Sequence, residues 1–241
     1  MSSNSWTQRT ELLLGRENLN KLKQSHVLVV GLGGVGAYAT EQLIRAGVGQ
    51  LTIADGDAIH ESNINRQLAA TTKTVGLKKS NVLKQRYLEI NPQLKLTVID
   101  KYINDAEMED FVLQSKYHFV IDAIDTLSPK IELIRSCIKH QIPIVSSMGS
   151  GAKIDPTKVI ISDISKSYND RLALAVRKRL RKLNIQKGLK VVFSTEVANK
   201  EAILVVENEK NKRSTTGTIS YMPAIFGLYC ASVAIREITD N

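Results

Sequence analysis

A glycine-rich segment stands between an apolar run and an amphipathic run of the chain. It reads Gly31-Leu32-Gly33-Gly34-Val35-Gly36, and the flanking residues 27–30 and 35–46 predict a buried strand and a helix. Glycines at such a junction permit a tight turn and let a phosphate group approach the backbone N–H groups at the positive end of the helix. The segment therefore predicts a strand–turn–helix unit in which Gly31, Gly33, Gly34 and Gly36 bind a nucleotide.

An acidic residue supports this prediction. Asp55 follows a second predicted strand, residues 51–54. A carboxylate about twenty residues beyond such a turn accepts hydrogen bonds from ribose hydroxyl groups. The alternative, a glycine-rich turn without a nucleotide, does not account for this acid. On these features alone, NAD and ATP are equally compatible with the site.

The alternation of apolar and amphipathic runs predicts the fold. Strands are expected at residues 27–30, 51–54, 95–99, 119–121 and 142–145, with helices at 35–46, 77–90, 106–114 and from Ser128-Pro129 onward. This order is typical of βαβ units and predicts an α/β fold with a Rossmann-like, doubly wound, mostly parallel sheet. Strands expected at 159–161, 190–193 and 202–206 lack regular helical crossovers, so we expect antiparallel strands to extend the sheet. Residues 1–241 are expected to form one domain, with halves of about 1–150 and 151–241.

Charged residues favour ATP over NAD. Arg66 lies in the run Ser62-Asn63-Ile64-Asn65-Arg66-Gln67, Lys79 follows Gly76, and Asp125 closes the run Asp122-Ala123-Ile124-Asp125. Residues just beyond the carboxyl ends of parallel strands converge on one crevice. Arg and Lys neutralise phosphate oxygens there, and a carboxylate can hold Mg²⁺. For Lys79 there are two alternatives: it is a solvated surface lysine, or the spacing is shifted by one residue and Lys78 takes this role. For Arg66 and Asp125 the alternative is a structural ion pair.

In order and spacing, these residues resemble the ubiquitin-activating type of adenylating enzymes, which include those that adenylate sulfur-carrier proteins. The resemblance implies that the chain is a single adenylating domain in which a carboxylate attacks the α-phosphate of ATP. The products would be an acyl-adenylate and pyrophosphate. The resemblance assigns Gly34 to the phosphate loop and Asp55 to ribose binding. It assigns contacts with the triphosphate to Asn63, Arg66 and Lys79.

The resemblance also implies a metal ion and a homodimer. Asp125 would position Mg²⁺, and a catalytic arginine near the N-terminus would reach across the dimer into the partner's site. Arg9 matches that arginine, with Arg16 as the alternative. Thr126 stands where many relatives carry Asn, which affects a secondary contact.

The two cysteines restrict the class of substrate. Cys137 and Cys230 cannot form the paired Cys-x-x-Cys zinc sites that protein-activating relatives often carry, and each is expected to be a small buried hydrophobe. The chain also has no room for the thioester domain of the ubiquitin-activating relatives. These observations favour a carboxylate on a small molecule or nucleic acid over the C-terminus of a carrier protein.

Residues 122–130, 149–157, 163–167 and 192–196 resemble the tRNA threonylcarbamoyladenosine dehydratase branch of this family. The branch resemblance implies ATP-dependent cyclisation of threonylcarbamoyladenosine next to the anticodon, by adenylation of the threonyl carboxylate and ring closure that releases AMP. It also implies a monovalent cation, K⁺ or Na⁺, for which the sequence shows no ligand pattern. The alternatives are an adenylyltransferase for a ubiquitin-like sulfur carrier, with a sulfur-transfer protein as partner, and a non-catalytic nucleotide-binding regulator.

A basic helix accounts for part of the net charge of +9. Residues 170–182 predict a helix with Leu172, Val176 and Leu180 on one face. The basic residues of this helix are predicted to contact tRNA phosphates: Arg171, Arg177, Lys178, Arg179, Arg181 and Lys182. A solvated amphipathic helix is the alternative, and DNA is not an expected partner.

The two ends of the chain bear on its location. The first residues lack the charged and apolar regions of a signal peptide, so a cytoplasmic location is expected. The apolar segment 219–235 is shorter than the roughly twenty residues that a membrane span requires. We expect a buried core or dimer-contact helix there, with peripheral membrane association as the open alternative.

Overall fold

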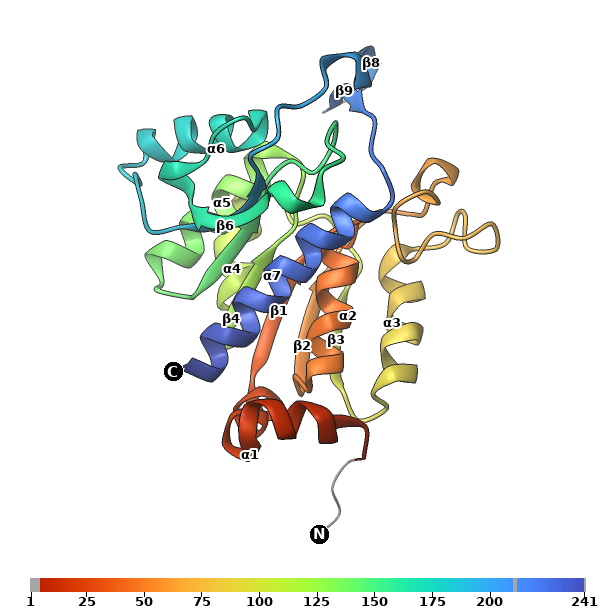
Figure 1. Ribbon diagram of the computed structural model, residues 1–241, viewed down its shortest axis with the longest axis vertical. Coiled ribbons are helices and arrows are strands. Elements are labelled where there is room, and N and C mark those ends of the chain that lie inside the picture. Colours follow the sequence, from red (N-terminus) through yellow and green to blue (C-terminus); the bar gives the residue numbers. More distant parts are fainter. Residues whose placement is uncertain (1–4, 210–211, 241) are drawn as a thin grey trace.

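A seven-stranded sheet forms the centre of the computed structural model, which describes residues 5–209 and 212–240 (Figure 1). The strand order is β3-β2-β1-β4-β5-β7-β6, and neighbouring strands are parallel except for the antiparallel pair β6 and β7. The strands span His26–Val30 (β1), Gln50–Ala54 (β2), Lys95–Ile99 (β3), Phe119–Asp122 (β4), Ile144–Ser147 (β5), Val159–Asp163 (β6) and Lys190–Ser194 (β7). The predicted α/β, mostly parallel, Rossmann-like sheet is confirmed.

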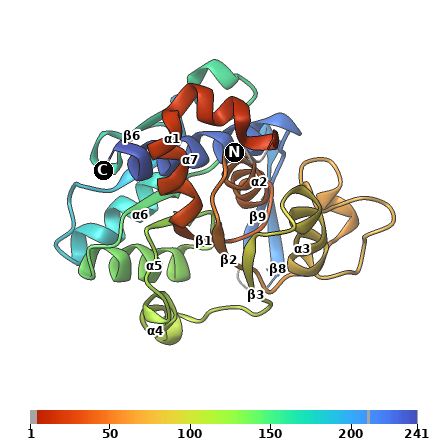
Figure 2. The ribbon, with the colours of Figure 1, turned by 90° about the horizontal axis from the view of Figure 1, so that it is seen from below.

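Helices cover both faces of this sheet. They span Gln8–Gln24 (α1), Gly36–Ala46 (α2), Lys79–Ile90 (α3), Met108–Leu113 (α4), Leu127–Lys139 (α5), Arg171–Lys182 (α6) and Tyr221–Asp240 (α7). Figure 2 shows α1, α2 and α7 on one side of the strands and α4 and α5 on the other. Strand β1 is buried throughout because it contributes to both layers. Val27 and Val29 belong to one apolar cluster, and Leu28 and Val30 belong to another.

Several elements differ from the sequence prediction. Helix α1 was not predicted, because it buries few apolar residues and is kinked at Gly15, whose φ is +81°. The strand expected at 142–145 begins instead at Ile144, since the Ile142 N–H bonds to Cys137 O at the end of α5. In the second half, β7 runs parallel to β5, and β8 (Ile203–Glu209) pairs with β9 (Lys212–Thr216) in a separate hairpin. The antiparallel extension of the main sheet is therefore the single strand β6.

The apolar C-terminal segment is a core helix, as predicted. Phe226 and Cys230 of α7 are fully buried, and a Cβ on Gly227 would lie 2.4 Å from Val35 O, so α7 packs closely on the start of α2. Burial raises the pKa of both the Cys137 and the Cys230 thiols to about 12, which fits their predicted role as buried hydrophobes. Within the described residues, no helix combines the length and apolar character needed to cross a membrane.

A buried ion pair joins the carboxyl ends of β4 and β5. Lys130 Nζ lies 2.6 Å from Asp122 Oδ2, and both side chains are fully buried. The hydroxyl of Ser146 donates to the same carboxylate oxygen, and Lys130 also donates to the carbonyl of Ser147. Asp122 Oδ1 accepts from the N–H of Ile124 and so fixes the turn that leads to Asp125. The pair therefore ties the sheet to the loop that carries a predicted site residue.

Replacement of Lys130 by Met is expected to lower the free energy of unfolding by about 3–5 kcal/mol, because the Asp122 carboxylate stays buried without its cation. Urea unfolding followed by circular dichroism measures the change. The double variant Asp122→Asn/Lys130→Met should lose less, because a neutral amide replaces the unpaired charge. A Lys130→Met protein as stable as the wild type would show that the pair does not hold this edge together.

Candidate functional site

The glycine segment forms a tight loop at the carboxyl end of β1. Gly31 has φ of +90°, and a Cβ there would lie 2.7 Å from Ala123 O. A Cβ on Gly36 would lie 1.8 Å from Gly31 O, so neither position admits a side chain. Gly33 is different, because a Cβ there would meet Gln67 Nε2 at an ordinary 3.7 Å. The constraint at Gly31 and Gly36 is thus the shape of the loop, whereas the backbone at Gly33 would accept a Cβ without a clash.

Asp55 holds the loop from the neighbouring strand. One carboxylate oxygen accepts the Leu32 N–H at 2.6 Å, and the other accepts the Asp57 N–H at 2.8 Å. Burial raises the pKa of Asp55, against the opposing effects of Lys79 and of these two hydrogen bonds. The acid predicted to bind ribose therefore lies directly beside the glycine loop.

Lys79 is a buried cation at the first turn of α3. Its side chain is 6% exposed, and its Nζ lies 2.7 Å from Asp57 Oδ2. Lys78 is exposed and turns away, toward Gly56 O and Asp100. Lys79 is therefore not a solvated surface lysine. Of the two lysines, Lys79 is the one that lies near Asp55.

The segment before α3 brings polar groups to the glycine loop. Asn63 is buried, and its Oδ1 accepts the N–H of His60. Arg66 Nη1 donates to Ser62 O at 2.7 Å, and the Arg66 carbonyl would lie 3.1 Å from a Cβ on Gly34. These contacts place Arg66 beside the loop. Among the described residues, no carboxylate forms an ion pair with Arg66, as a purely structural role would require.

The neighbouring Gln67 has an unsatisfied polar atom. Its Oε1 is buried and has no hydrogen-bond partner among the described residues. Its Nε2 faces Gly33, at the open position of the loop. A buried amide oxygen without a partner at this place is a candidate ligand contact that the sequence analysis did not single out.

Asp125 is exposed on the turn after β4. The turn packs on the glycine loop through Ala123, whose N–H donates to Val30 O and whose carbonyl approaches Gly31. The structure therefore brings together the glycine loop, Asp55, Lys79, the Asn63–Gln67 segment and the turn that carries Asp125. They meet at the carboxyl edge of the parallel strands, where ligands of open α/β sheets bind.

Arg9 lies away from this group. It is exposed on α1, and the neighbouring Thr7 approaches Gly47 at the far end of α2 from the glycine loop. Figure 1 shows α1 below the sheet, opposite the β8–β9 hairpin. The alternative, Arg16, pairs with Glu11 on the same helix. One protomer therefore does not bring either arginine to its own glycine loop.

The basic helix α6 is exposed on its charged side. Val176 and Leu180 face the core, Leu172 is half-buried, and the Asp170 carboxylate caps the first turn by accepting the Ala173 N–H. Arg177 differs from the other cations because its Nη1 donates to the carbonyl and the hydroxyl of Ser167. The remaining predicted tRNA contacts lie exposed: Arg171, Lys178, Arg179, Arg181 and Lys182.

Four further residues position this edge of the sheet but were not among the predicted site residues. Asp57 pairs with Lys79, and Glu196 accepts the N–H groups of Ile154 and Asp155. Lys153 pairs with Asp170 in the interior. Asp57 has the clearest sequence signal, because it follows Asp55 by two residues. The partners of the other three are distant in sequence, so spacing could not have revealed them.

Comparisons with known proteins agree with this geometry. The model of the ThiF family matches residues 7–241. The tRNA threonylcarbamoyladenosine dehydratase of Bacillus subtilis is 38% identical over 97% of this chain and 94% of that protein. The ATP complex of the corresponding Escherichia coli enzyme superimposes with a TM-score of 0.88 and 33% identity, over 100% of this chain and 97% of that one. The Escherichia coli sulfur carrier protein ThiS adenylyltransferase is 35% identical over 56% of this chain and 53% of that protein.

Proposed function

The chain belongs to the ThiF family, and from that premise we propose that it is an ATP-dependent tRNA threonylcarbamoyladenosine dehydratase. It adenylates the threonyl carboxylate of the modified adenosine next to the anticodon. A nucleophile within the substrate then closes the ring. The net change in the tRNA is the loss of one water molecule, while ATP becomes AMP and pyrophosphate.

The extent of the similarity carries this proposal. The Bacillus subtilis dehydratase resembles the chain over nearly its whole length, whereas the sulfur-carrier adenylyltransferase resembles just over half of it. A shared nucleotide half alone would support adenylation of any carboxylate. Similarity through the second half supports the RNA substrate, because α6 lies in that half. We accordingly assign nucleotide binding to about residues 1–150 and substrate binding to about residues 151–241.

The residues at the carboxyl edge suit ATP. The open position at Gly33 and the N-terminus of α2 offer backbone N–H groups to phosphate oxygens. The unsatisfied amide of Gln67 gives a ligand one more polar contact there. Lys79 and Arg66 supply positive charge to the triphosphate, and Asp55 accepts from the ribose hydroxyls.

Asp125 suits a magnesium ion held jointly with ATP. Among the described residues there is no cluster of three or more His, Cys, Asp or Glu that could hold a metal. Mg²⁺ is commonly bound by one or two carboxylates together with substrate phosphates, and it retains several waters. The exposed Asp125 carboxylate meets this requirement. The ion would neutralise charge that develops on the phosphate oxygens.

The chemistry requires positioning and charge stabilisation. A threonyl carboxylate oxygen bonds to the α-phosphorus, and the bond from that phosphorus to the oxygen bridging the α- and β-phosphates breaks, which releases pyrophosphate. Attack within the substrate then breaks the bond between the acyl carbon and AMP. Arg66 and Lys79 stabilise the charge on the reacting phosphates. No cysteine thiolate is needed, in keeping with the raised pKa values of the two buried thiols.

A homodimer would complete the site. Leu12 and Leu13 on α1 are 80% and 83% exposed, and Trp6 is 42% exposed just before that helix. Large apolar side chains exposed together favour contact with another protein surface. Arg9 lies on the same helix, and we propose that a second copy binds there and receives Arg9 at its own glycine loop.

Other expectations accompany this function. A monovalent cation, a sulfur-transfer protein partner and a cytoplasmic location stay predictions from the sequence. The contacts of Arg171, Arg177, Lys178, Arg179, Arg181 and Lys182 with tRNA phosphates are proposed on charge, with Arg177 already bonded to Ser167.

The direct test of the reaction uses ATP, Mg²⁺ and tRNA that carries the linear modification. Mass spectrometry of the digested tRNA should show the loss of one water, with AMP and pyrophosphate released. Asp125→Ala and Lys79→Gln should each lower the rate at least about 100-fold, since charge stabilisation at the phosphates is lost.

Lys78→Gln is the matched control, because Lys78 is exposed and turned away from the site. It should react like the wild type. No mass change in the tRNA, together with adenylation of a carrier protein that ends in Gly-Gly, would replace this proposal with the sulfur-carrier alternative.

Mixed dimers test the role of Arg9. Arg9→Ala and Lys79→Gln proteins, each inactive alone, should recover about a quarter of the wild-type activity after subunit exchange, because half of the dimers then contain one intact site. A mixture of Lys79→Gln and Asp125→Ala should stay inactive, since each site keeps one defect. Failure of the first mixture to recover would assign Arg9 to its own protomer or to no site.

Charge reversal tests the basic helix. The triple variant Arg171→Glu, Lys178→Glu and Arg181→Glu should bind tRNA more weakly, and its slope of log affinity against log salt should fall by about two to three. The control reverses three exposed lysines at the amino edge of the sheet, Lys23, Lys95 and Lys116. Both variants carry the same net charge, so equal losses would show that α6 has no specific role.

A further inference from the structure

Three apolar side chains are exposed on the loops that surround the start of α6. Ile154 follows β5, Tyr168 precedes α6, and Val197 follows β7; their exposed fractions are 67%, 52% and 70%. Scattered apolar residues are ordinary on a protein surface, but these belong to loops that contact one another. We call the surface formed by Ile154, Tyr168 and Val197 the Tyr168 surface.

Hydrogen bonds hold the three loops together. The Glu196 carboxylate accepts the N–H of Ile154 at 3.0 Å, so the residue before Val197 is bonded to the loop after β5. The side-chain amide of Asn169 donates to Thr195 O at 2.9 Å, which joins the residue after Tyr168 to the loop after β7. The Tyr168 surface is therefore one local structure.

A buried ion pair makes this surface rigid. Lys153 Nζ lies 2.8 Å from Asp170 Oδ2, and the two side chains are 2% and 1% exposed. Lys153 also donates to Gly149 O, and the other Asp170 oxygen caps α6. The Tyr168 ring packs against the buried ring of Phe193, with centroids 5.8 Å apart and planes at 74°. Tyr168 is thus oriented before any ligand binds.

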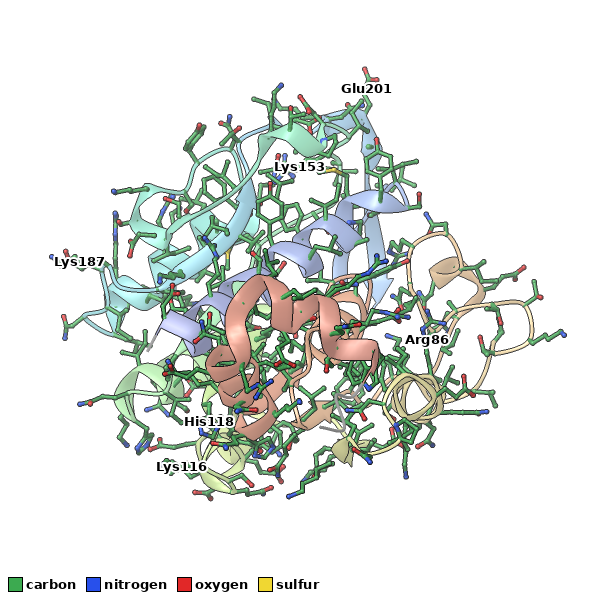
Figure 3. All side chains as sticks on the ribbon, turned by 60° about the horizontal axis from the view of Figure 1, so that its bottom comes forward. Arg86, Lys116, His118, Lys153, Lys187 and Glu201 are labelled. Atoms are coloured by element: carbon green, nitrogen blue, oxygen red, sulfur yellow. The ribbon has the colours of Figure 1, made fainter. Side chains whose placement is uncertain are left out.

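The Tyr168 surface lies at the carboxyl edge of the sheet, beside the start of the basic helix. Gly149 comes shortly after the carboxyl end of β5, and a Cβ there would lie 3.3 Å from Asp170 Oδ2. Arg171, the first residue of α6, is three residues from Tyr168. Figure 3 places Lys153 at the opposite end of the view from Lys116 and His118, which precede β4. An exposed aromatic ring therefore lies next to the first cation of α6, at the same carboxyl edge of the sheet as the proposed adenylation site.

We propose that the Tyr168 surface stacks unpaired bases of the tRNA anticodon loop while α6 binds the adjoining phosphates. The inference rests on the proposed function, in which the substrate is a tRNA modified beside its anticodon. Bases of single-stranded RNA loops stack on aromatic side chains, and every base has a face that can do so. Ile154 and Val197 extend the apolar contact beyond the ring. The neighbouring positive charge favours RNA over an uncharged protein partner.

Binding of two RNA probes tests this inference. One probe is an anticodon stem-loop with an unmodified adenosine beside the anticodon, and the other is a fully paired RNA duplex with the same number of phosphates. Tyr168→Ala should weaken binding of the stem-loop about fivefold or more and leave binding of the duplex unchanged. Tyr168→Phe retains the ring and should bind both probes like the wild type. ATP binding serves as the check that the fold is intact.

A second pair of variants avoids the contact between Tyr168 and Phe193. Val197→Asp places a carboxylate on the Tyr168 surface, whereas Leu113→Asp makes the same change at a half-exposed position at the end of α4. The first should weaken stem-loop binding and the second should not. Stem-loop binding that is unchanged in both Tyr168→Ala and Val197→Asp would overturn the inference, while cyclisation of the modified tRNA by the wild type would leave the proposed function standing. A wild type that neither binds the RNA nor reacts with it would overturn both.

Discussion

The buried pair of Lys130 and Asp122 is the interaction on which the carboxyl edge of the sheet depends. An unpaired carboxylate or ammonium group in the interior would cost several kcal/mol, so each group requires the other and the hydrogen bonds around them. The same Asp122 carboxylate orders the turn toward Asp125 through the N–H of Ile124. Ala123 of this turn packs against Gly31. One pair thus links β4, β5, α5 and the glycine loop.

The regions proposed to bind the nucleotide and the substrate each contain an ion pair of their own. Lys79 and Asp57 lie beside Asp55 on the nucleotide side, where Lys79 is near enough to oppose the rise in the pKa of Asp55. Lys153 and Asp170 lie on the proposed substrate side, where they join the loop after β5 to the start of α6. Lys79, Lys153 and Asp170 are buried, and such charges resist rearrangement because a buried charge without its partner lies in a medium of low polarity; Asp57 is 39% exposed. Both sides are therefore largely formed before a substrate arrives.

Much of the fold could be predicted because its signals are local. The period of apolar residues predicted most strands, and the glycine loop with Asp55 predicted how β1, α2 and β2 connect. Helix α1 escaped prediction because tertiary contacts with α7, rather than its own pattern, hold it in place. The start of β5 was displaced because Ile142 bonds back to α5. The first case was decided by a contact far along the chain, and the second by a hydrogen bond between residues five apart that the apolar period does not reveal.

The sequence by itself determined the class of fold, the position of the glycine turn and the residue types of the proposed ATP site, since these depend on spacing along successive strand–turn–helix units. The tertiary structure decided which charges are buried, which are engaged and which face solvent. It paired Lys79 with Asp57, bonded Arg177 to Ser167, and set Arg9 away from the glycine loop of its own chain. It also gathered Tyr168 and its neighbours from three loops. These contacts join separate segments of the chain. They form when the strands assemble into the sheet and bring their carboxyl ends to one edge.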